Sequence, residues 1–432
     1  MLDSKEAEYG GEMLYINKSA SRPMWQMEYS RDEGLRKYWD EFSPPYHKEG
    51  DGPLHKGENA SAYNHNQDAH AIENVARWFE YWEQRAGTGT RVNGGGVNIV
   101  FSESNTHHRG AENYRRSGEV DAMRIIKDGF YSHEVMWDGW VNSEKPLIHL
   151  LGHWNYKEGV VKNMYVVANT EKVELFVNGQ SLGFGERSNQ FLFTFKNVTW
   201  KSGNVTAIGY DKNNQQVCKD VHTTAGNPFA VRMKAIENHN IILANGADLA
   251  LVEFEVVDDK GNRCPTALNE INFDVKGEGI WRGGIAQGKD NYILSTTLPV
   301  ECGVNRFFIR STTKPGSIAI TAKADGLQAA TLQLQSKPIT LINGLTTSLP
   351  QDGLKSNLAK GATPLTSSIV VTRKPLPIVA ATAGAKEDKV KDSYDDNEAS
   401  AWSNDGKLNT AWIEFDLGEP SVINQVVLKL NN

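Results

Sequence analysis

Cysteine is scarce in this sequence, with Cys218, Cys264 and Cys302 the three among 432 residues. They lie far apart and match neither a CxxC pair nor the ligand spacing of a zinc site. Their number does not specify a disulfide framework, so it neither requires nor excludes an oxidising compartment. We expect no metal ion and no cofactor.

Excess basic charge and long apolar runs are also lacking. The formal net charge is −7 at pH 7, which argues against nucleic acid and against an anionic membrane as the main partner. No stretch approaches the ~18 to 20 consecutive apolar residues of a spanning helix, so we expect no membrane span. The first residues have neither the basic start nor the apolar centre of a signal peptide.

The chain is long and rich in tryptophan. Its 432 residues suffice for three or four domains, and 39% hydrophobic with 23% charged residues is a globular composition. The eleven tryptophans fill ordinary cores or bind sugar, because an aromatic ring also packs on the apolar C–H face of a pyranose. Trp137 is a candidate sugar platform, with packing between domains as the alternative. The sequence does not set the oligomeric state.

Before residue 145, apolar runs alternate with amphipathic segments. Residues 22–28 form an apolar run that ends in a carboxylate, and residues 94–101 form a glycine turn that enters a second run. Apolar positions at i, i+3, i+4 and i+7 predict a helix over 68–85, and a further helix is expected over 120–131. This rhythm is typical of a parallel α/β domain. Two such units cannot close a sheet or a barrel, so we expect the end of a larger domain.

After residue 145, the apolar pattern changes to the period of two that indicates β-strands. Short strands separated by turn signals, with a hairpin at Asn178-Gly179, predict two successive β-sandwiches. Residues 338–390 are rich in Ser, Thr, Pro, Ala and Lys, which is the composition of a linker. The expected strands are 161–168, 173–177, 191–195 and 205–210 in the first sandwich, and 231–233, 251–257, 271–275, 305–310 and 318–322 in the second.

Glu28 is the strongest candidate for a catalytic group. It follows a buried strand and precedes a polar loop, which in an α/β barrel is the C-terminal mouth where catalytic groups lie. Cleavage of a glycosidic bond needs two carboxylates, one as nucleophile or base and one as proton donor. The alternative is that Glu28 only pairs with Arg22, Arg31 or Arg109, and the residues alone do not decide.

The polar loop 102–110 supplies further candidates for substrate binding. Glu103 occupies a comparable strand end and is expected to contact substrate or an arginine rather than to serve as the second carboxylate. We interpret Asn105, His107 and Arg109 as polar groups that line a sugar subsite. The histidines of this loop would make only a weak metal site, since no fourth ligand has a clear spacing.

Three motifs behind the α/β part carry a family resemblance: HLLGHWNY (149–156), YVVANT (165–170) and VELFVNGQSLG (173–183). They resemble the region behind the barrel in glycoside hydrolase family 2, the β-galactosidase-like enzymes. Residues 242–269 look like the Ig-like module that often follows in that family. Residues 397–418 resemble the opening of a discoidin-like carbohydrate-binding module.

The resemblance implies a multidomain fold: the end of a (β/α)8 TIM barrel, two immunoglobulin-like β-sandwiches and a partial β-sandwich module. The implied domains are the C-terminal part of the catalytic barrel (1–145), an Ig-like sandwich (146–226), a second Ig-like sandwich (227–337), a linker or irregular segment (338–390) and an incomplete discoidin-like module (391–432).

The resemblance also implies an activity, because Glu28 matches the family nucleophile. The family carries its acid/base as an Asn-Glu pair on an earlier barrel strand, and no Asn-Glu pair here occupies a matching place. We therefore expect a fragment of a retaining β-galactosidase-like hydrolase that keeps the nucleophile and lacks the proton donor. Its expected partner is an oligo- or polysaccharide with β-linkages, and its expected location is periplasmic or extracellular. The alternative is a non-catalytic carbohydrate-binding or scaffold protein of Ig-like modules.

Overall fold

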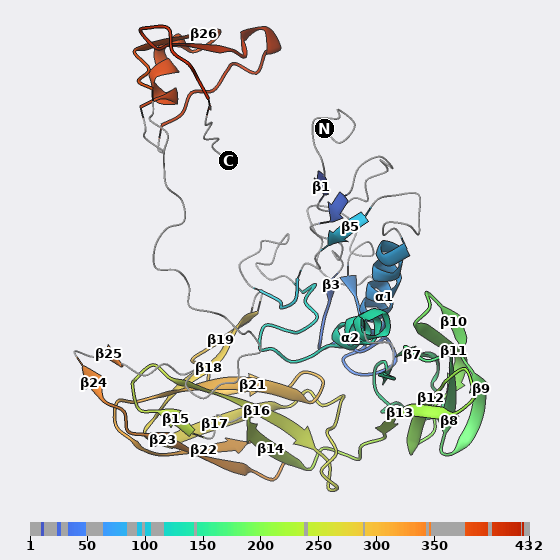
Figure 1. Ribbon diagram of the computed structural model, residues 1–432. Helices are drawn as coiled ribbons and strands as arrows, with labels where there is room; N and C mark the ends of the chain where they lie inside the picture. Colours follow the sequence, from blue (N-terminus) through green and yellow to red (C-terminus); the bar gives the residue numbers. More distant parts are fainter. Residues whose placement is uncertain are drawn as a thin grey trace. The chain divides into compact units, whose positions relative to one another are not determined.

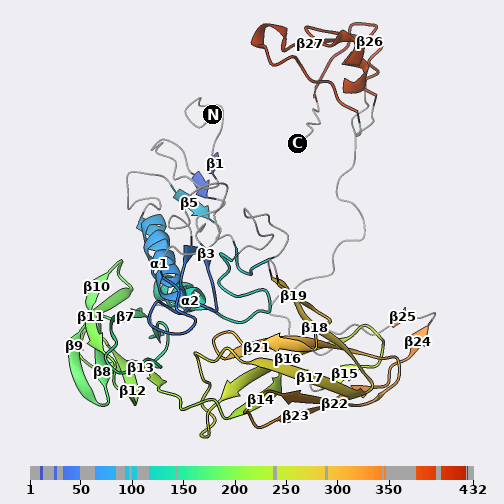
Figure 2. The same cartoon turned by 180° about the vertical axis from the view of Figure 1, so that it is seen from behind.

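The structure, a computed structural model, forms two compact units, Met1–Asp352 and Gly353–Asn432. The first unit contains an α/β segment and two β-sandwiches, and the second contains a small β module (Figures 1 and 2). No described helix is long and apolar enough to cross a membrane. The described residues are 10–12, 24–26, 33–48, 64–83, 93–96, 100–104, 116–141, 145–236, 241–287, 290–342, 345–346, 376–395, 400–424 and 426.

Short parallel strands mark the α/β segment. One sheet has the order β1-β2-β5, so β2 is central, and its last residue Gln26 pairs with Gly96 of β5. A second parallel pair joins β3 to β4. Parallel pairing is what the predicted α/β rhythm requires. The strands are β1 (Gly10–Glu12), β2 (Met24–Gln26), β3 (Glu33–Gly34), β4 (Asn64–His65) and β5 (Asn93–Gly96).

Two helices, α1 (Gln67–Glu83) and α2 (Asp128–Val141), pack against each other through a shared apolar core. The position of α1 confirms the helix predicted over 68–85. The helix predicted over 120–131 is wrong, because α2 begins only at Asp128. The Asp121 carboxylate accepts the Ile125 N–H at 2.8 Å, and Arg124 adopts a left-handed backbone with φ of 64°. This turn replaces the first helical residues that the apolar pattern predicts.

The first sandwich consists of two four-stranded sheets, β10-β11-β7-β6 and β13-β12-β8-β9. Alternate residues of the inner strands meet in one core, built around Trp154, Leu175 and Phe193. All four predicted strands are confirmed, as is the β8–β9 hairpin at Asn178-Gly179. The strands are β6 (Ile148–Leu150), β7 (Val161–Ala168), β8 (Lys172–Val177), β9 (Gln180–Phe184), β10 (Glu186–Ser188), β11 (Leu192–Thr199), β12 (Asn204–Tyr210) and β13 (Gln216–Thr223).

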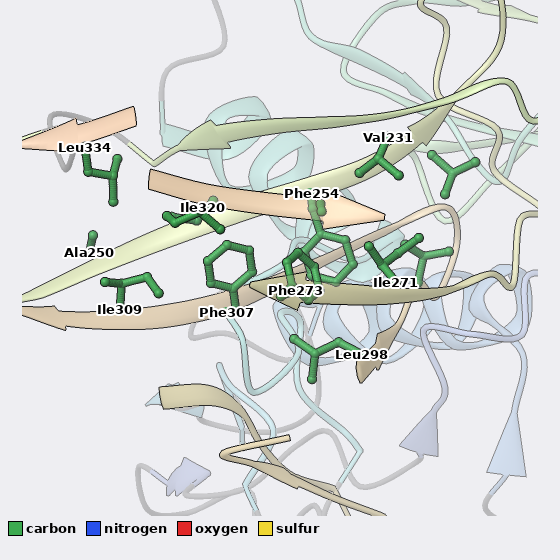
Figure 3. Close-up of a cluster of buried hydrophobic side chains, with 14 of the residues drawn as sticks. Val231, Ala250, Phe254, Ile271, Phe273, Leu298, Phe307, Ile309, Ile320 and Leu334 are labelled. Carbon is green, nitrogen blue, oxygen red and sulfur yellow. The ribbon is translucent and has the colours of Figure 1, made fainter. Parts of the chain in front are cut away.

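The second sandwich is larger, with the sheets β14-β16-β21-β18-β19 and β15-β23-β22-β17-β20. Its core contains Phe254, Phe273 and Phe307, whose ring centroids lie 4.8 to 5.9 Å apart (Figure 3). The strands are β14 (Ala230–Ala235), β15 (Ile241–Leu243), β16 (Leu249–Val257), β17 (Glu270–Gly277), β18 (Gly279–Gln287), β19 (Asp290–Ile293), β20 (Thr297–Pro299), β21 (Val304–Ser311), β22 (Gly316–Lys323) and β23 (Ala330–Lys337), followed by the pair β24 (Leu341–Ile342) and β25 (Leu345–Thr346).

The α/β segment packs on both sandwiches. Its helices share a buried cluster with Val167 of β7, and Met123 and Ile125 share another with Val304 of β21. On the second sandwich, Arg306 donates to the carbonyl oxygen of Met123, and two of its guanidinium nitrogens donate to one carboxylate oxygen of Glu253 on β16. The three parts of the first unit therefore share buried contacts.

In the second unit, β26 (Ala380–Ala383) pairs antiparallel with β27 (Ile413–Asp416). Two short 3-10 helices accompany them, η3 (Glu387–Ser393) and η4 (Leu408–Thr410). The Trp402 indole N–H donates to the carbonyl oxygen of Ala385 at 2.9 Å and ties the loop before η4 to the end of β26. The domain boundaries expected from the sequence stay predictions.

Candidate functional site

The candidate nucleophile Glu28 comes two residues after the central strand β2 and lies outside the described residues, as do Asn105, His107 and Arg109. The geometry around them is partly described. Parallel pairing of Gln26 with the last residue of β5 means that both strands end at the same edge of the sheet. In parallel α/β folds this is the edge where catalytic loops begin.

Glu103 is a buried ion-pair partner. Its carboxylate accepts the Lys127 ammonium at 2.8 Å, and both side chains are almost fully buried. The same ammonium donates to the carbonyl oxygens of Gly34 and Arg116 at 2.7 and 2.8 Å. Lys127 thus links Glu103 to Gly34 at the end of β3. The sequence predicted substrate or an arginine as the partner of Glu103, and the observed partner is a lysine. A contact between Glu103 and substrate stays a prediction.

Trp137 lies on α2 with 52% of its surface exposed. Its ring centroid is 6.2 Å from that of Trp78 on α1, with an angle of 36° between the planes. The exposed ring surface is compatible with a sugar platform, and that role of Trp137 stays a prediction.

A buried charged network fixes the segment that follows β3. The Lys162 ammonium on β7 lies 2.5 Å from the Asp40 carboxylate and 2.8 Å from that of Asp68 in the first turn of α1. It also contacts the Tyr156 hydroxyl at 2.9 Å, and that hydroxyl donates to Asp40 at 2.6 Å. We call these four side chains the Lys162 network. The network joins the α/β segment to the first sandwich. Its groups are mutually paired, so it is suited to positioning rather than to reaction.

His153 completes the Lys162 network as a neutral imidazole. Its Nδ1 accepts the Asn155 backbone N–H at 2.8 Å, so the ring proton resides on Nε2, which donates to the Ser43 hydroxyl at 3.0 Å. The ring stacks on Tyr156 with centroids 4.5 Å apart. Burial lowers the pKa of His153 to about 3, although Asp40 attracts a proton to it.

Burial opposes ionisation of both carboxylates of the Lys162 network, but their net pKa shifts have opposite signs. Burial is the largest single influence on Asp40 and opposes its ionisation, but the charge of the Lys162 ammonium and the hydrogen bonds from Lys162 and Tyr156 act together against it, and the Asp40 pKa is lowered to about 2. Burial raises the pKa of Asp68 to about 6, since the one ammonium near it is shared with Asp40. Two buried carboxylates thus share one cation, and Asp68 is the one that holds a proton more readily.

These pKa values predict opposing pH effects on stability. In the folded chain the pKa of His153 lies below its ordinary value of 6.5. The neutral His153 therefore makes its full contribution to the free energy of unfolding above pH 6.5, and this contribution is lost as the pH falls towards 3. Asp68 has a folded pKa above 3.8, so its contribution is complete below that pH and is lost as the pH rises through 6. Replacing His153 by asparagine keeps an acceptor for the Asn155 N–H. As the pH falls from about 6.5 to about 4.5, the free energy of unfolding of His153→Asn should rise relative to that of the wild type by about 1–3 kcal/mol, because the variant has no imidazole to protonate.

Urea-induced unfolding at several pH values, followed by tryptophan fluorescence, measures this change. The variant Asp68→Asn serves as the opposite control, because its stability should decline relative to wild type as the pH falls through the same window. Parallel pH profiles for all three proteins would show that these groups keep ordinary pKa values in the folded chain.

A second anchor links the α/β segment to the second sandwich. The buried Arg36 guanidinium lies 2.8 Å from the Asp121 carboxylate and 3.4 Å from that of Glu301. It also donates to the carbonyl oxygen of Val304 at 2.7 Å, while the Trp39 indole donates to that of Pro265 at 2.8 Å. The segment 33–48 is therefore held by both sandwiches.

Sequence reasoning missed Lys162 and Arg36 as structural centres. A signal for Lys162 exists in the run VKNMYVVA, because period two places this lysine on the same face as the core residue Met164. A lysine at an inward strand position requires a buried partner. No comparable periodicity marks Arg36, since it lies in an irregular segment. Within the described part of the chain, no three His, Cys, Asp or Glu side chains are arranged to hold a metal ion.

Two family models match the β-rich part of the chain. Residues 233–333 match glycoside hydrolase family 2 C-terminal domain 5, and residues 159–218 match a domain of unknown function. The first match lies in the second sandwich, and the second match spans β7 to β12 of the first sandwich together with the first residues of β13.

Known proteins extend the match into the α/β segment. The chain is 36% identical over 333 residues to a β-glucuronidase of Formosa agariphila, covering 76% of this chain and 32% of that protein. It is 32% identical over 228 residues to a β-galactosidase of Bacteroides ovatus, covering 51% of this chain and 26% of that protein. A solved structure of a β-glucuronidase from glycoside hydrolase family 2 matches with a TM-score of 0.67 and 33% identity, over 84% of this chain and 36% of that one. The chain therefore spans about a third of the length of these relatives or less.

Proposed function

We propose that this chain, which has the sequence and the fold of the C-terminal part of glycoside hydrolase family 2 proteins, serves in a retaining glycosidase with Glu28 as nucleophile. The observation that carries the proposal is the place of β2 between β1 and β5 in a parallel sheet, with Glu28 two residues beyond its end. A strand end of this kind holds a carboxylate rigidly at the mouth of a barrel.

The proposed chemistry has two steps. The Glu28 carboxylate attacks the anomeric carbon and forms a glycosyl ester, while a second carboxylic acid gives its proton to the departing oxygen. Water then attacks the ester, gives its proton to that second group, and releases the sugar with its configuration retained. No Asn-Glu pair of this sequence occupies the matching place, so the proposal assigns the proton donor to residues outside these 432.

We also propose an identity for each domain. The α/β segment would be the end of a (β/α)8 barrel, and the two sandwiches would be its Ig-like modules. The second unit, with its antiparallel pair β26 and β27, would be part of a discoidin-like carbohydrate-binding module. We place the protein in the periplasm or outside the cell, where polymeric glycans are found.

The proposed substrates are β-glucuronides or β-galactosides, because the relatives carry these two names. The two sugars differ in the group on C5, which is a carboxylate in one and a hydroxymethyl in the other. Arg109, predicted to line the subsite, would pair with the carboxylate of a glucuronide.

A leaving group that needs no proton tests this function. Dinitrophenolate leaves without protonation, so the chain is expected to release it from a dinitrophenyl β-glucuronide or β-galactoside and to keep the sugar on Glu28. Mass spectrometry of peptides from the quenched reaction locates the sugar, and the preferred substrate names the sugar class. A label on another residue, or no label from either substrate, would contradict the assignment of Glu28.

A further inference from the structure

An open groove lies at the edge of the first sandwich and is lined by residues of the β8–β9 hairpin and of the strands β10 and β11. Figure 1 shows the course of these strands. Its volume is about 560 Å³, within the range of about 300–1,000 Å³ typical of small-ligand sites. Buried Val177, Phe195 and Val198 contribute to its lining, and Leu182 and Phe184 border it with 46% and 56% of their surfaces exposed. We call it the edge groove.

The backbone keeps this groove open. A bulge in β9 lies between Ser181 and Phe184, and Gly185 then carries the chain across to β10. A Cβ at Gly185 would lie 2.8 Å from the Phe195 ring, so only glycine lets the chain pass this close to the core. Leu182 and Phe184 therefore stay at the border of the sandwich instead of entering its core.

The Phe184 ring is held in place before any ligand arrives. Tyr210 contacts it edge-on, with centroids 6.0 Å apart, and the Lys172 ammonium lies 4.9 Å from its centre. Tyr210 is itself fixed, because its hydroxyl donates to the Glu174 carboxylate at 2.8 Å. A fixed, exposed aromatic ring costs little conformational entropy on binding and suits the apolar face of a pyranose.

The rim of the edge groove is polar and carries one uncompensated positive charge. Lys196 and Glu186 neutralise each other across 2.6 Å. The exposed Lys201 has no carboxylate within 4.0 Å among the described residues. Asn197 and Thr199 add groups that can hydrogen-bond to hydroxyls. Although the chain has a net charge of −7, Lys201 gives this rim a local positive charge, which can pair with an anionic ligand that also carries hydroxyl groups.

We propose that the edge groove binds an anionic glycan, a chain of sugars that includes uronic acids. One sugar lies with its C–H face on Phe184, and the carboxylate of a neighbouring sugar pairs with Lys201. The choice of a glycan rests on the proposed function. The residues that line the edge groove lie on β8 to β11 and in the loop after β11, whereas the candidate nucleophile Glu28 follows β2 in the sequence.

A protein strand is the competing occupant, because β9 is an edge strand of its sheet. The bulge and the short length of β9 argue against strand addition, which requires a regular row of free backbone groups. Gly183, with φ of 86°, interrupts that row further.

Affinity electrophoresis of the intact chain tests the proposal. The gels contain alginate, polygalacturonate or a β-linked glucuronan, each compared with its carboxyl-reduced form. We expect retardation by at least one anionic polymer and about tenfold weaker binding in Phe184→Ala. Lys201→Gln should weaken binding to the anionic polymer severalfold and leave binding to the carboxyl-reduced polymer unchanged. Phe184→Trp should retain binding, and Val221→Ala, on the opposite edge strand β13, should behave as wild type.

Three results would overturn the proposal. These are the absence of retardation by all three polymers, equal retardation of wild type and Phe184→Ala, and self-association in sedimentation that the groove variants abolish. Thermal unfolding of Phe184→Ala verifies that it folds as wild type does. The outcome is independent of catalysis, because Glu28→Gln should bind in the gel as well as wild type. Binding without sugar transfer would contradict only the proposed hydrolase function.

Discussion

The variant Lys162→Met is expected to lower the free energy of unfolding of the first unit by about 3–5 kcal/mol at pH 7.5. Methionine keeps most of the length of the side chain and removes its charge. The buried carboxylates of Asp40 and Asp68, 2.5 and 2.8 Å from the ammonium in the wild type, then have no cation between them. Breaking one partner of a buried ion pair costs far more than the pair contributes, because the remaining charge stays desolvated.

Urea unfolding and calorimetry of the intact chain measure this loss. The loss should be smaller at pH 5, where the raised pKa of Asp68 lets this carboxyl take up a proton in the folded state. Adding Asp68→Asn to the variant should recover part of the loss. The matched control is Lys196→Met, whose ion pair with Glu186 is exposed, and it should leave the transition unchanged. A Lys162→Met variant as stable as wild type would mean that the Lys162 network does not hold the α/β segment.

The second large effect concerns Glu28. Replacing it by glutamine should reduce the release of dinitrophenolate from the preferred β-glycoside by at least about 10⁴-fold, because the amide does not form the glycosyl ester. Glu28→Gly leaves room for a small anion. With added azide it should form the α-glycosyl azide, whose inverted configuration shows that azide attacks from the side of the missing carboxylate.

The control for Glu28 is Glu41→Gln, an exposed carboxylate in the same part of the chain, which should keep the wild-type rate. Formation of the β-glycosyl azide, or release from Glu28→Gln at the wild-type rate, would show that another group is the nucleophile. Either result would leave the fold and the stability predictions unaffected.

In the first sandwich the sequence predicts the central strands well and the edge strands poorly, for a physical reason. β7, β8, β11 and β12 bury alternate residues, so the period of two is visible. β6, β10 and β13 lie at sheet edges, and β10 and β13 have mostly exposed side chains on both faces, which leaves no apolar alternation to find. In the second sandwich β18 was not predicted, because glycines and bulges replace its alternation.

The candidate site shows a different limit of sequence reasoning. Glu28 is a candidate on the basis of a local pattern, because a buried strand followed by a carboxylate is typical of barrel mouths. The Lys162 network joins residues that are 94 and 122 positions apart, and no local pattern reveals which carboxylates meet the lysine. The helix predicted over 120–131 shows the same limit, since the Asp121 side chain competes for a backbone N–H and delays the helix.

The double anchoring of residues 33–48 has a consequence for how genes of this kind recombine. A crossover at the apparent border near residue 145 would bring Asp40 from one parent to Lys162 from another, and Arg36 to a foreign Glu301. Such chimaeric proteins should fold stably only when both parents carry the same buried charges at these positions. A crossover near Asp352, between the two compact units, separates neither of these two ion pairs. We therefore expect exchange of the second unit between relatives to be tolerated more readily than a crossover near residue 145, which separates both ion pairs.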